Sequence, residues 1–249
     1  MVSRAVERYA SDGVLIAGGA RAILLQVADP VVAAGVARHS DFAHRPVERL
    51  RNTLTFAYAV VLGTPEDVAR VTAWVNRAHG PVVRAEDAQL QLWVAATLYE
   101  TAVRVHERVF GRTNAALADE LYRAYSALGT ALQMPAALWP EDRASFSEYW
   151  DARVAALDVS DDARGVADDL FAPVVAPLWL RAGLPLARVL TLDLLPAPLR
   201  EAYGFEWSPA LTRRADRAWS VIRVLARLTP HRLRSTPARR YLRRLRRTD

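Results

Sequence analysis

Apolar residues recur every three to four positions along almost the whole of this chain. Strands need apolar and polar residues to alternate, and no such run occurs, while the β-branched residues also fall within helical spacing. Prolines stand at expected helix starts and breaks, and glycine is scarce, with 11 residues in 249. With no internal repeat and no low-complexity linker, the pattern predicts an all-α protein, a single globular domain of about ten helices.

Twelve segments have this helical spacing. They are residues 14–28, 30–38, 47–62, 65–78, 85–110, 114–132, 143–157, 160–171, 185–194, 198–203, 209–228 and 237–247. The clearest start is Thr64-Pro65-Glu66-Asp67, a threonine cap followed by proline and two acids, and a second is Ser160-Asp161-Asp162. Two prolines within residues 134–140 predict a loop there.

Composition narrows the classes of protein that this chain can belong to. Hydrophobic residues make up 52% of the sequence, enough for a substantial core. Cysteine is absent, which excludes disulfides, thiolate metal sites and a cysteine nucleophile. The start lacks the pattern of a signal peptide, and residues 14–28 are too short and too interrupted to span a bilayer. We therefore expect a cytoplasmic protein.

Lysine is also absent, so all 33 basic residues are arginine. This excludes Schiff-base chemistry and the lysine of a phosphate-binding P-loop. The sequence has no Gly-x-Gly-x-x-Gly, His-Glu-x-x-His or Gly-x-Ser-x-Gly motif. Any demanding chemistry must come from carboxylates, histidine or a bound cofactor.

His79 is one candidate ligand. It falls four residues after Val75 and eight after Val71, which predicts an imidazole on the buried face of a helix that Gly80-Pro81 then ends. A neutral imidazole is a good ligand for haem iron. A partly buried histidine bonded to a backbone carbonyl has the same spacing, so the pattern alone leaves both interpretations open.

Arg49 and Thr53 stand four residues apart and project from one face of the expected helix 47–62, whose other side carries Leu50 and Leu54. An arginine directed inward needs an anionic partner, because an unpaired buried charge is costly. A haem propionate or a substrate oxygen would serve, and so would a salt bridge to a nearby carboxylate.

The other histidines give weaker signals. His39-Ser40-Asp41-Phe42-Ala43-His44 has the composition of a metal site, but also that of a helix end at which Ser and Asp act as caps, which is the simpler interpretation. His106 has charged neighbours and is expected to be solvated. His231 belongs to no recognisable constellation.

The net charge of +6 is concentrated at the end of the chain, where Asp216 and Asp249 are the only acids after Glu206. Segment 237–247 places Tyr241, Leu242 and Leu245 near one face, among six arginines. Such a basic amphipathic helix suits peripheral contact with an anionic membrane, although a solvated terminus has the same composition. No aromatic interleaving or reading motif supports specific binding to nucleic acid.

Several blocks, in the expected order, resemble the catalytic domain of the MpaB and rubber oxygenases (latex-clearing proteins). The blocks are Gly19-Ala20-Arg21-Ala22-Ile23-Leu24-Leu25-Gln26, Pro30-Val31-Val32-Ala33-Ala34-Gly35-Val36, His39-Ser40-Asp41-Phe42, Arg49-Leu50-Arg51-Asn52-Thr53, Gly63-Thr64-Pro65-Glu66, Val75-Asn76-Arg77-Ala78-His79, Leu92-Trp93-Val94-Ala95-Ala96-Thr97-Leu98, Leu195-Pro196-Ala197-Pro198-Leu199-Arg200 and Tyr203-Gly204-Phe205. Each block alone is weak, and the ordered set covers most of the chain.

The resemblance implies a rubber-oxygenase-like helical fold, haem b, and oxidative cleavage of carbon–carbon double bonds in apolar isoprenoids. His79 would be the proximal ligand of the iron. Arg49 and Thr53 match the family's arginine and threonine beside the haem, as catalytic residues, and Arg49 would also contact the cofactor.

Three further residues within the matching blocks, Gln26, Trp93 and Thr97, are candidate cofactor contacts. Trp93 and Thr97 lie one helical turn apart, and that spacing equally suits packing in the core.

The chain also departs from the family. Rubber-cleaving members carry a lysine where this chain has Asn52, and they are longer and exported, so rubber itself is not the expected substrate. We expect residues 1–236 to form a haem-dependent oxygenase domain that uses dioxygen on a small apolar olefin, followed by a basic tail, 237–249. The alternative is a helical protein that binds haem or a lipid without turnover, possibly at a membrane surface.

Overall fold

The computed structural model describes residues 2–39, 44–80, 84 and 86–247, apart from the side chains of His39 and His79. Within these ranges the chain forms fifteen α-helices and two 3-10 helices (η1 and η2), and no strand. The prediction of an all-α fold is confirmed. The helices outnumber the expected ten because some predicted segments are divided into two helices. Short additional helices also lie in the connections between longer ones.

The first part of the chain, up to the long helix α6, contains seven elements. They are α1 (Arg4–Ala10), η1 (Gly13–Gly18), α2 (Gly19–Val27), α3 (Pro30–His39), α4 (Pro46–Leu62), α5 (Pro65–His79) and α6 (Ala88–Phe110).

The second part contains ten. They are α7 (Ala115–Tyr125), α8 (Ala127–Thr130), η2 (Ala136–Leu138), α9 (Arg143–Ala155), α10 (Asp161–Phe171), α11 (Leu178–Leu194), α12 (Ala197–Ala202), α13 (Pro209–Leu228), α14 (His231–Arg234) and α15 (Thr236–Leu245).

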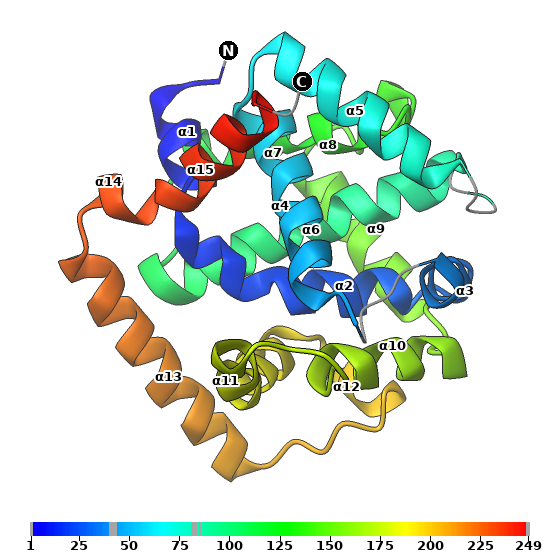
Figure 1. Cartoon of the computed structure of the whole chain (residues 1–249), viewed down its shortest axis with the longest axis vertical. Coiled ribbons are helices and arrows are strands. Elements are labelled where there is room, and N and C mark those ends of the chain that lie inside the picture. Colours follow the sequence, from blue (N-terminus) through cyan, green and yellow to red (C-terminus); the bar gives the residue numbers. More distant parts are fainter. Residues whose placement is uncertain (1, 40–43, 81–83, 85, 248–249) are drawn as a thin grey trace.

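Helix α6 runs through the middle of the molecule and packs against α2, α7, α8, α13 and η1. Figure 1 shows α5 at the top, α10, α11 and α12 below α2, and α13 along the outer edge. Trp93 of α6 is fully buried, as are Leu24 and Leu25 of α2 on the facing helix. The α2–α6 contact therefore forms the centre of the core.

A buried ion pair joins α2 to α6. Arg21 is 1% exposed, and its Nη1 lies 2.5 Å from Oε2 of Glu100. The same nitrogen donates to Oγ1 of Thr101 (2.6 Å), and Nε donates to the carbonyl oxygen of Leu194 in α11 (2.7 Å). The second Glu100 oxygen accepts from Nε of Arg104, 2.7 Å away. One guanidinium thus connects three helices.

Both predicted helix starts are confirmed. Thr64 and Asp67 form a reciprocal capping box at the start of α5, and the Ser160 hydroxyl accepts from the backbone N–H of Ala163. The predicted loop at 134–140 is present and contains the short 3-10 turn Ala136–Leu138.

The prediction of a single α-helix over 14–28 is wrong. Its first part is the 3-10 helix η1, and α2 begins at Gly19. A Cβ at Gly18 would lie 2.4 Å from Cγ2 of Thr101 and 2.9 Å from Cγ2 of Val105, so the chain passes too close to α6 for any side chain there. The segment therefore changes from the 3-10 helix η1 to the α-helix α2 at the point where it packs closely against α6.

Other helix bounds also differ from prediction. Segment 85–110 begins only at Ala88, because the side chain of Asp87 caps α6 by accepting from two backbone N–H groups. Segment 114–132 is divided at Ser126. Helix α11 starts seven residues before Pro185, which lies inside it, so this proline interrupts one backbone hydrogen bond without ending the helix.

The expected C-terminal basic helix forms as α15 and packs against α4. Leu242 and Leu245 lie against the core, and the Tyr241 ring centroid is 5.9 Å from that of Tyr58 in α4. Arg246 Nη2 pairs with Oδ2 of Asp67 at 2.6 Å. The apolar face of this helix is therefore covered by the rest of the domain.

His106 is half-buried rather than solvated, contrary to the prediction from its charged neighbours. Its ring stacks on Tyr9 of α1, with centroids 4.1 Å apart. Burial lowers the pKa of His106 to about 4. Neighbours in sequence indicate little about an aromatic partner nearly a hundred residues away.

Among the described residues, no single helix is long and apolar enough to cross a membrane. Arg4–Ala10 and Gly13–Val27 meet that length and composition only as a pair, bent by 47°.

Replacing Glu100 tests the buried ion pair. Glu100→Gln leaves the buried guanidinium of Arg21 without its counter-charge, and we expect the free energy of unfolding to fall by about 3–5 kcal/mol in urea denaturation. Arg104→Gln is the matched control, because the Arg104 side chain is more than half exposed and its loss should cost below about 1 kcal/mol. Equal losses in the two variants would contradict the assignment.

His106 predicts a dependence of stability on pH. Its pKa of about 4 in the folded state lies below the unfolded value of about 6.5, so the unfolded chain takes up the proton first. The contribution of neutral His106 is complete above pH about 6.5 and is lost as the pH falls to about 4. Thermal unfolding between these values should be less sensitive to pH in His106→Phe, and an unchanged slope would contradict the burial.

Candidate functional site

Arg49 and Thr53 lie in the first half of α4, one turn apart. Both are half-buried, and the Thr53 hydroxyl donates to the carbonyl oxygen of Arg49 at 3.2 Å. Burial lowers the pKa of the Arg49 guanidinium, while the neighbouring Glu48 opposes this shift. A partly desolvated cation of this kind suits a carboxylate or another anionic oxygen.

The surroundings of this pair are incompletely packed. Every residue from 48 to 55 is half-buried, so this half of α4 has neither a fully buried nor a fully exposed face. Its apolar members include Leu50 and Leu54, and Leu50 reaches towards the start of α2, where a Cβ at Gly19 would lie 3.4 Å from Cδ1. Apolar surface therefore remains partly uncovered beside Arg49.

His79 is the last residue of α5, and the N–H of Gly80 bonds to the carbonyl oxygen of Asn76 as the helix ends. Val71 and Val75 are buried, as the helical spacing predicted. The orientation of the His79 imidazole lies outside the described part of the chain, so its role as a ligand stays a prediction. Arg49 lies in the first turn of α4 and His79 ends α5, so in sequence both are remote from the turn that joins these two helices.

The structure brings together two other predicted residues, Gln26 of α2 and Thr97 of α6. Nε2 of Gln26 donates to the Thr97 hydroxyl at 3.1 Å, and that hydroxyl donates to the carbonyl oxygen of Val94 at 2.7 Å. Thr97 is fully buried, whereas Ile23, one turn before Gln26, and Leu98, the residue after Thr97, are half-buried.

Trp93 has the structural role that its spacing also allowed. It is fully buried, its Nε1 donates to the carbonyl oxygen of Leu25 at 3.1 Å, and its ring stacks on Trp150 with centroids 5.3 Å apart. The Arg153 guanidinium lies 5.5 Å from its centroid. Trp93 thus packs in the core one turn before Thr97 on α6, and its Nε1–H already donates a hydrogen bond.

The weak metal-site candidate at residues 39–44 falls outside the structure except for His44 and the backbone of His39. Among the residues that the structure does describe, no group of three His, Asp or Glu side chains is placed to hold a metal ion. Nε2 of His231 lies 2.8 Å from the carbonyl oxygen of Arg8 and 3.5 Å from Oγ of Ser11.

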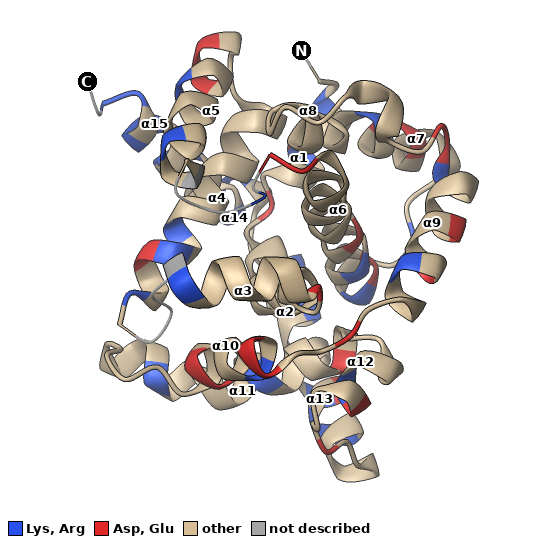
Figure 2. Cartoon of the chain, turned by 90° about the vertical axis from the view of Figure 1, so that its right-hand side faces the viewer, with Lys and Arg blue, Asp and Glu red and all other residues tan. Residues whose placement is uncertain are grey.

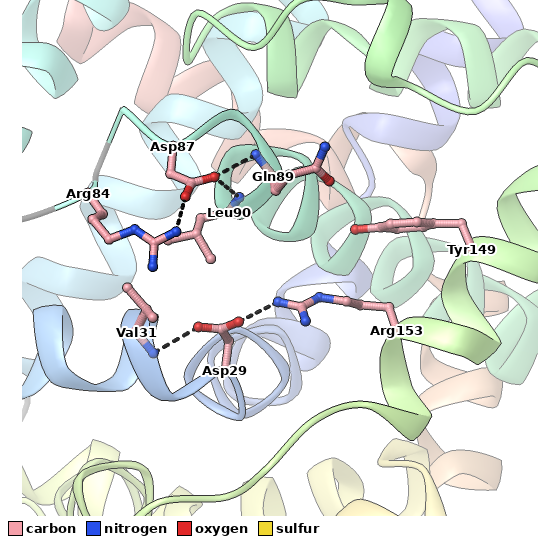
Figure 3. A pocket seen from close by; sticks show the side chains of 8 residues that line it. All are labelled: Asp29, Val31, Arg84, Asp87, Gln89, Leu90, Tyr149 and Arg153. Atoms are coloured by element: carbon pink, nitrogen blue, oxygen red, sulfur yellow. Dashed lines mark hydrogen bonds and ion pairs between the residues drawn. The ribbon is translucent and has the colours of Figure 1, made fainter.

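A pocket of about 390 Å³ opens between the starts of α3 and α6 and the helix α9. Figure 3 shows its lining, in which Arg153 pairs with Asp29 and Arg84 with Asp87. The full lining is Asp29, Val31, Arg84, Asp87, Gln89, Leu90, Tyr149 and Arg153. None of the six predicted site residues is among them.

The charges of this pocket already have partners within the protein. Besides its pair with Arg153, Asp29 caps α3 by accepting from the backbone N–H groups of Val31 and Val32. Burial raises the pKa of Tyr149 to about 12, so its hydroxyl stays protonated. The charged groups of this pocket are therefore satisfied without a ligand.

The sequence reasoning overlooked both Arg21 and the Asp29–Arg153 pair. Arg21 was visible as a single charge within an apolar helical run, on the same face as Leu24 and Leu25. Asp29 before Pro30 was visible as a cap, but nothing local indicates that Arg153, 124 positions later, pairs with it.

Comparison with known proteins places these features in a family. The family model of the "ER-bound oxygenase mpaB/B'/Rubber oxygenase, catalytic domain" matches residues 7–228. Two uncharacterized proteins, from Mycobacterium tuberculosis and Mycobacterium bovis, are each 36% identical over 227 residues, which is 84% of this chain and 88% of theirs. No solved structure matches.

The match runs from α1 to the end of α13 and includes every predicted site residue. It stops before α14 and α15, so the basic C-terminal helix lies outside the matched region. The chain belongs to the mpaB/rubber oxygenase catalytic-domain family, a family of oxygenases.

Proposed function

We propose that this protein is a haem b-dependent oxygenase that acts on a small apolar olefin of isoprenoid type. The observation that carries the proposal is the family match over residues 7–228, because it identifies an oxygenase catalytic domain within a range that includes Arg49, Thr53 and His79.

The residues present fit a haem in their donor chemistry. A b-type haem requires one axial side chain from the protein, and not a cluster of ligands. His79 would be that ligand, at the end of α5. The half-buried guanidinium of Arg49, whose pKa is lowered by burial, would bind a propionate or another anionic oxygen.

The apolar surroundings fit as well. The half-buried Leu50 and Leu54 on α4 and Ile23 and Leu98 near the Gln26–Thr97 contact supply apolar surface that a porphyrin or an olefin would cover. Covering it would remove roughly 25 cal/mol of unfavourable hydration per Å².

Haem, when bound, would supply the iron at which dioxygen is activated. Thr53 would contribute a hydroxyl that can leave its bond to the Arg49 carbonyl oxygen and donate to a substrate or oxygen atom. Arg49 would hold positive charge beside that hydroxyl. The apolar residues would exclude water, and Gln26 with Thr97 would lie beside the bound haem or olefin.

The axial role of His79 gives a spectroscopic prediction. Protein produced with added haem precursor should show a Soret band, and His79→Ala should reduce its intensity roughly tenfold, as loss of the only strong iron ligand implies. His231→Ala is the matched control, because His231 lies beyond the matched region, and it should keep the wild-type band. A His79→Ala variant with full Soret intensity and position would contradict the assignment.

Oxygen uptake separates turnover from passive binding. With a linear isoprenoid olefin in detergent, the haem-loaded protein should consume dioxygen in a substrate-dependent way. Arg49→Ala should lower the rate per bound haem roughly 10²-fold, a typical cost for losing one group that stabilises developing charge.

The control for that experiment is Arg51→Ala, which removes an arginine from the neighbouring position of the same helix, off the Arg49–Thr53 face. Haem-loaded wild-type protein that consumes no dioxygen with any olefin would instead support a haem- or lipid-binding protein without turnover.

A further inference from the structure

The outward face of α13 carries an apolar patch. Val221, Val224, Leu225 and Leu228 are each more than half exposed, and Leu228 is 76% exposed. They recur at helical spacing on the side opposite the buried face of α13. Exposed apolar side chains occur singly on most surfaces, but four on one helical face mark a contact surface.

Helix α14 extends this patch. Leu233 is 63% exposed and follows the end of α13 by five residues. Arg234 holds α14 in place, because its Nη1 donates to the carbonyl oxygen of Thr229 at 2.7 Å and its Nε donates to Oδ2 of Asp12 at 2.8 Å. The apolar patch is therefore a fixed feature of the fold.

Exposed arginines accompany the patch. Arg213, Arg214 and Arg217 occupy the outward face of the first half of α13, and Arg227 and Arg232 flank the apolar half. The one acid on this helix, Asp216, already pairs with Arg108. Figure 2 shows that acidic residues gather instead along α10.

We propose that this α13–α14 face, defined by Val221, Val224, Leu225, Leu228 and Leu233 with the flanking arginines, docks on an anionic lipid bilayer. The face lies on the outer edge of the molecule (Figure 1), where a flat surface can reach it. A bilayer interface offers both of the groups that this face requires, acyl chains for the apolar residues and phosphates for the arginines.

A second copy of the chain complements this face less well. Apposing two such faces would bring their arginines together, and like charges in contact repel. Residues 207–247 contain thirteen arginines and a single acid, so a symmetric contact has few carboxylates to offer. Anionic lipid supplies the missing charge.

Helix α15 differs from α13 in what it leaves exposed. Its Leu242 and Leu245 pack against the core, so α15 presents arginines without exposed apolar neighbours. The predicted membrane contact of segment 237–247 would therefore be electrostatic only, whereas α13 can also insert apolar side chains.

Vesicle co-sedimentation tests the proposal, with the full chain and no haem requirement. Wild-type protein should bind vesicles of phosphatidylcholine and phosphatidylglycerol in equal amounts, should bind pure phosphatidylcholine weakly, and should be released by high salt. Two variants divide the α13 face. One combines Val221→Ser, Leu225→Ser and Leu228→Ser, and the other Arg213→Gln, Arg214→Gln and Arg217→Gln.

Each variant should lower the partition coefficient roughly tenfold, since each loses three contacts with the interface. The matched control combines Arg240→Gln, Arg243→Gln and Arg244→Gln on α15, with the same change of net charge, and should keep most of the binding. All substitutions in the three variants are at exposed positions, so circular dichroism should show unaltered folding.

Two results would overturn the proposal. One is that anionic vesicles bind the serine variant as tightly as wild type, and the other is that they bind neither protein. A dimer in sedimentation equilibrium that the serine variant abolishes, without vesicle binding by wild type, would assign the face to a second copy instead. Because no arm of this test involves haem, its failure is independent of the proposed oxygenase activity.

Discussion

The arrangement of this fold depends on one buried charge. Arg21 lies in the core and cannot remain there without Glu100, because a buried guanidinium needs both a counter-charge and filled hydrogen bonds. Its partners come from α6 and α11, so satisfying one side chain fixes three helices relative to one another. The same two helices, α2 and α6, supply Gln26 and Thr97, so the ion pair also fixes the two helices that this hydrogen bond joins.

A second set of charges secures the hairpin of α4 and α5, the two helices that carry Arg49, Thr53 and His79. Asp67 closes the capping box of α5 and also binds Arg246, so one carboxylate joins the start of α5 to the C-terminal helix. Helix α15 packs against α4. The first half of α4, which contains Arg49 and Thr53, is only half-buried.

The sequence predicted what local rules control. Helical spacing predicted the fold class, and the Thr64 and Ser160 starts were identified because capping is a property of adjacent residues. It could not predict the partner of His106 or the approach of η1 to α6, which depend on tertiary packing. For the site, spacing placed Arg49 beside Thr53, but the Gln26–Thr97 bond joins positions 71 apart and has no local signal. Family resemblance, and not spacing, connected these positions to one another.

The central claim is that this domain holds one haem b. A pyridine haemochrome assay on the full-length protein, purified from cells supplied with haem precursor, measures both the type of haem and its ratio to the chain. The expected result is the spectrum of haem b at about one equivalent per chain, the stoichiometry that a single axial histidine implies. Folded protein of full helical content that contains no haem would contradict it.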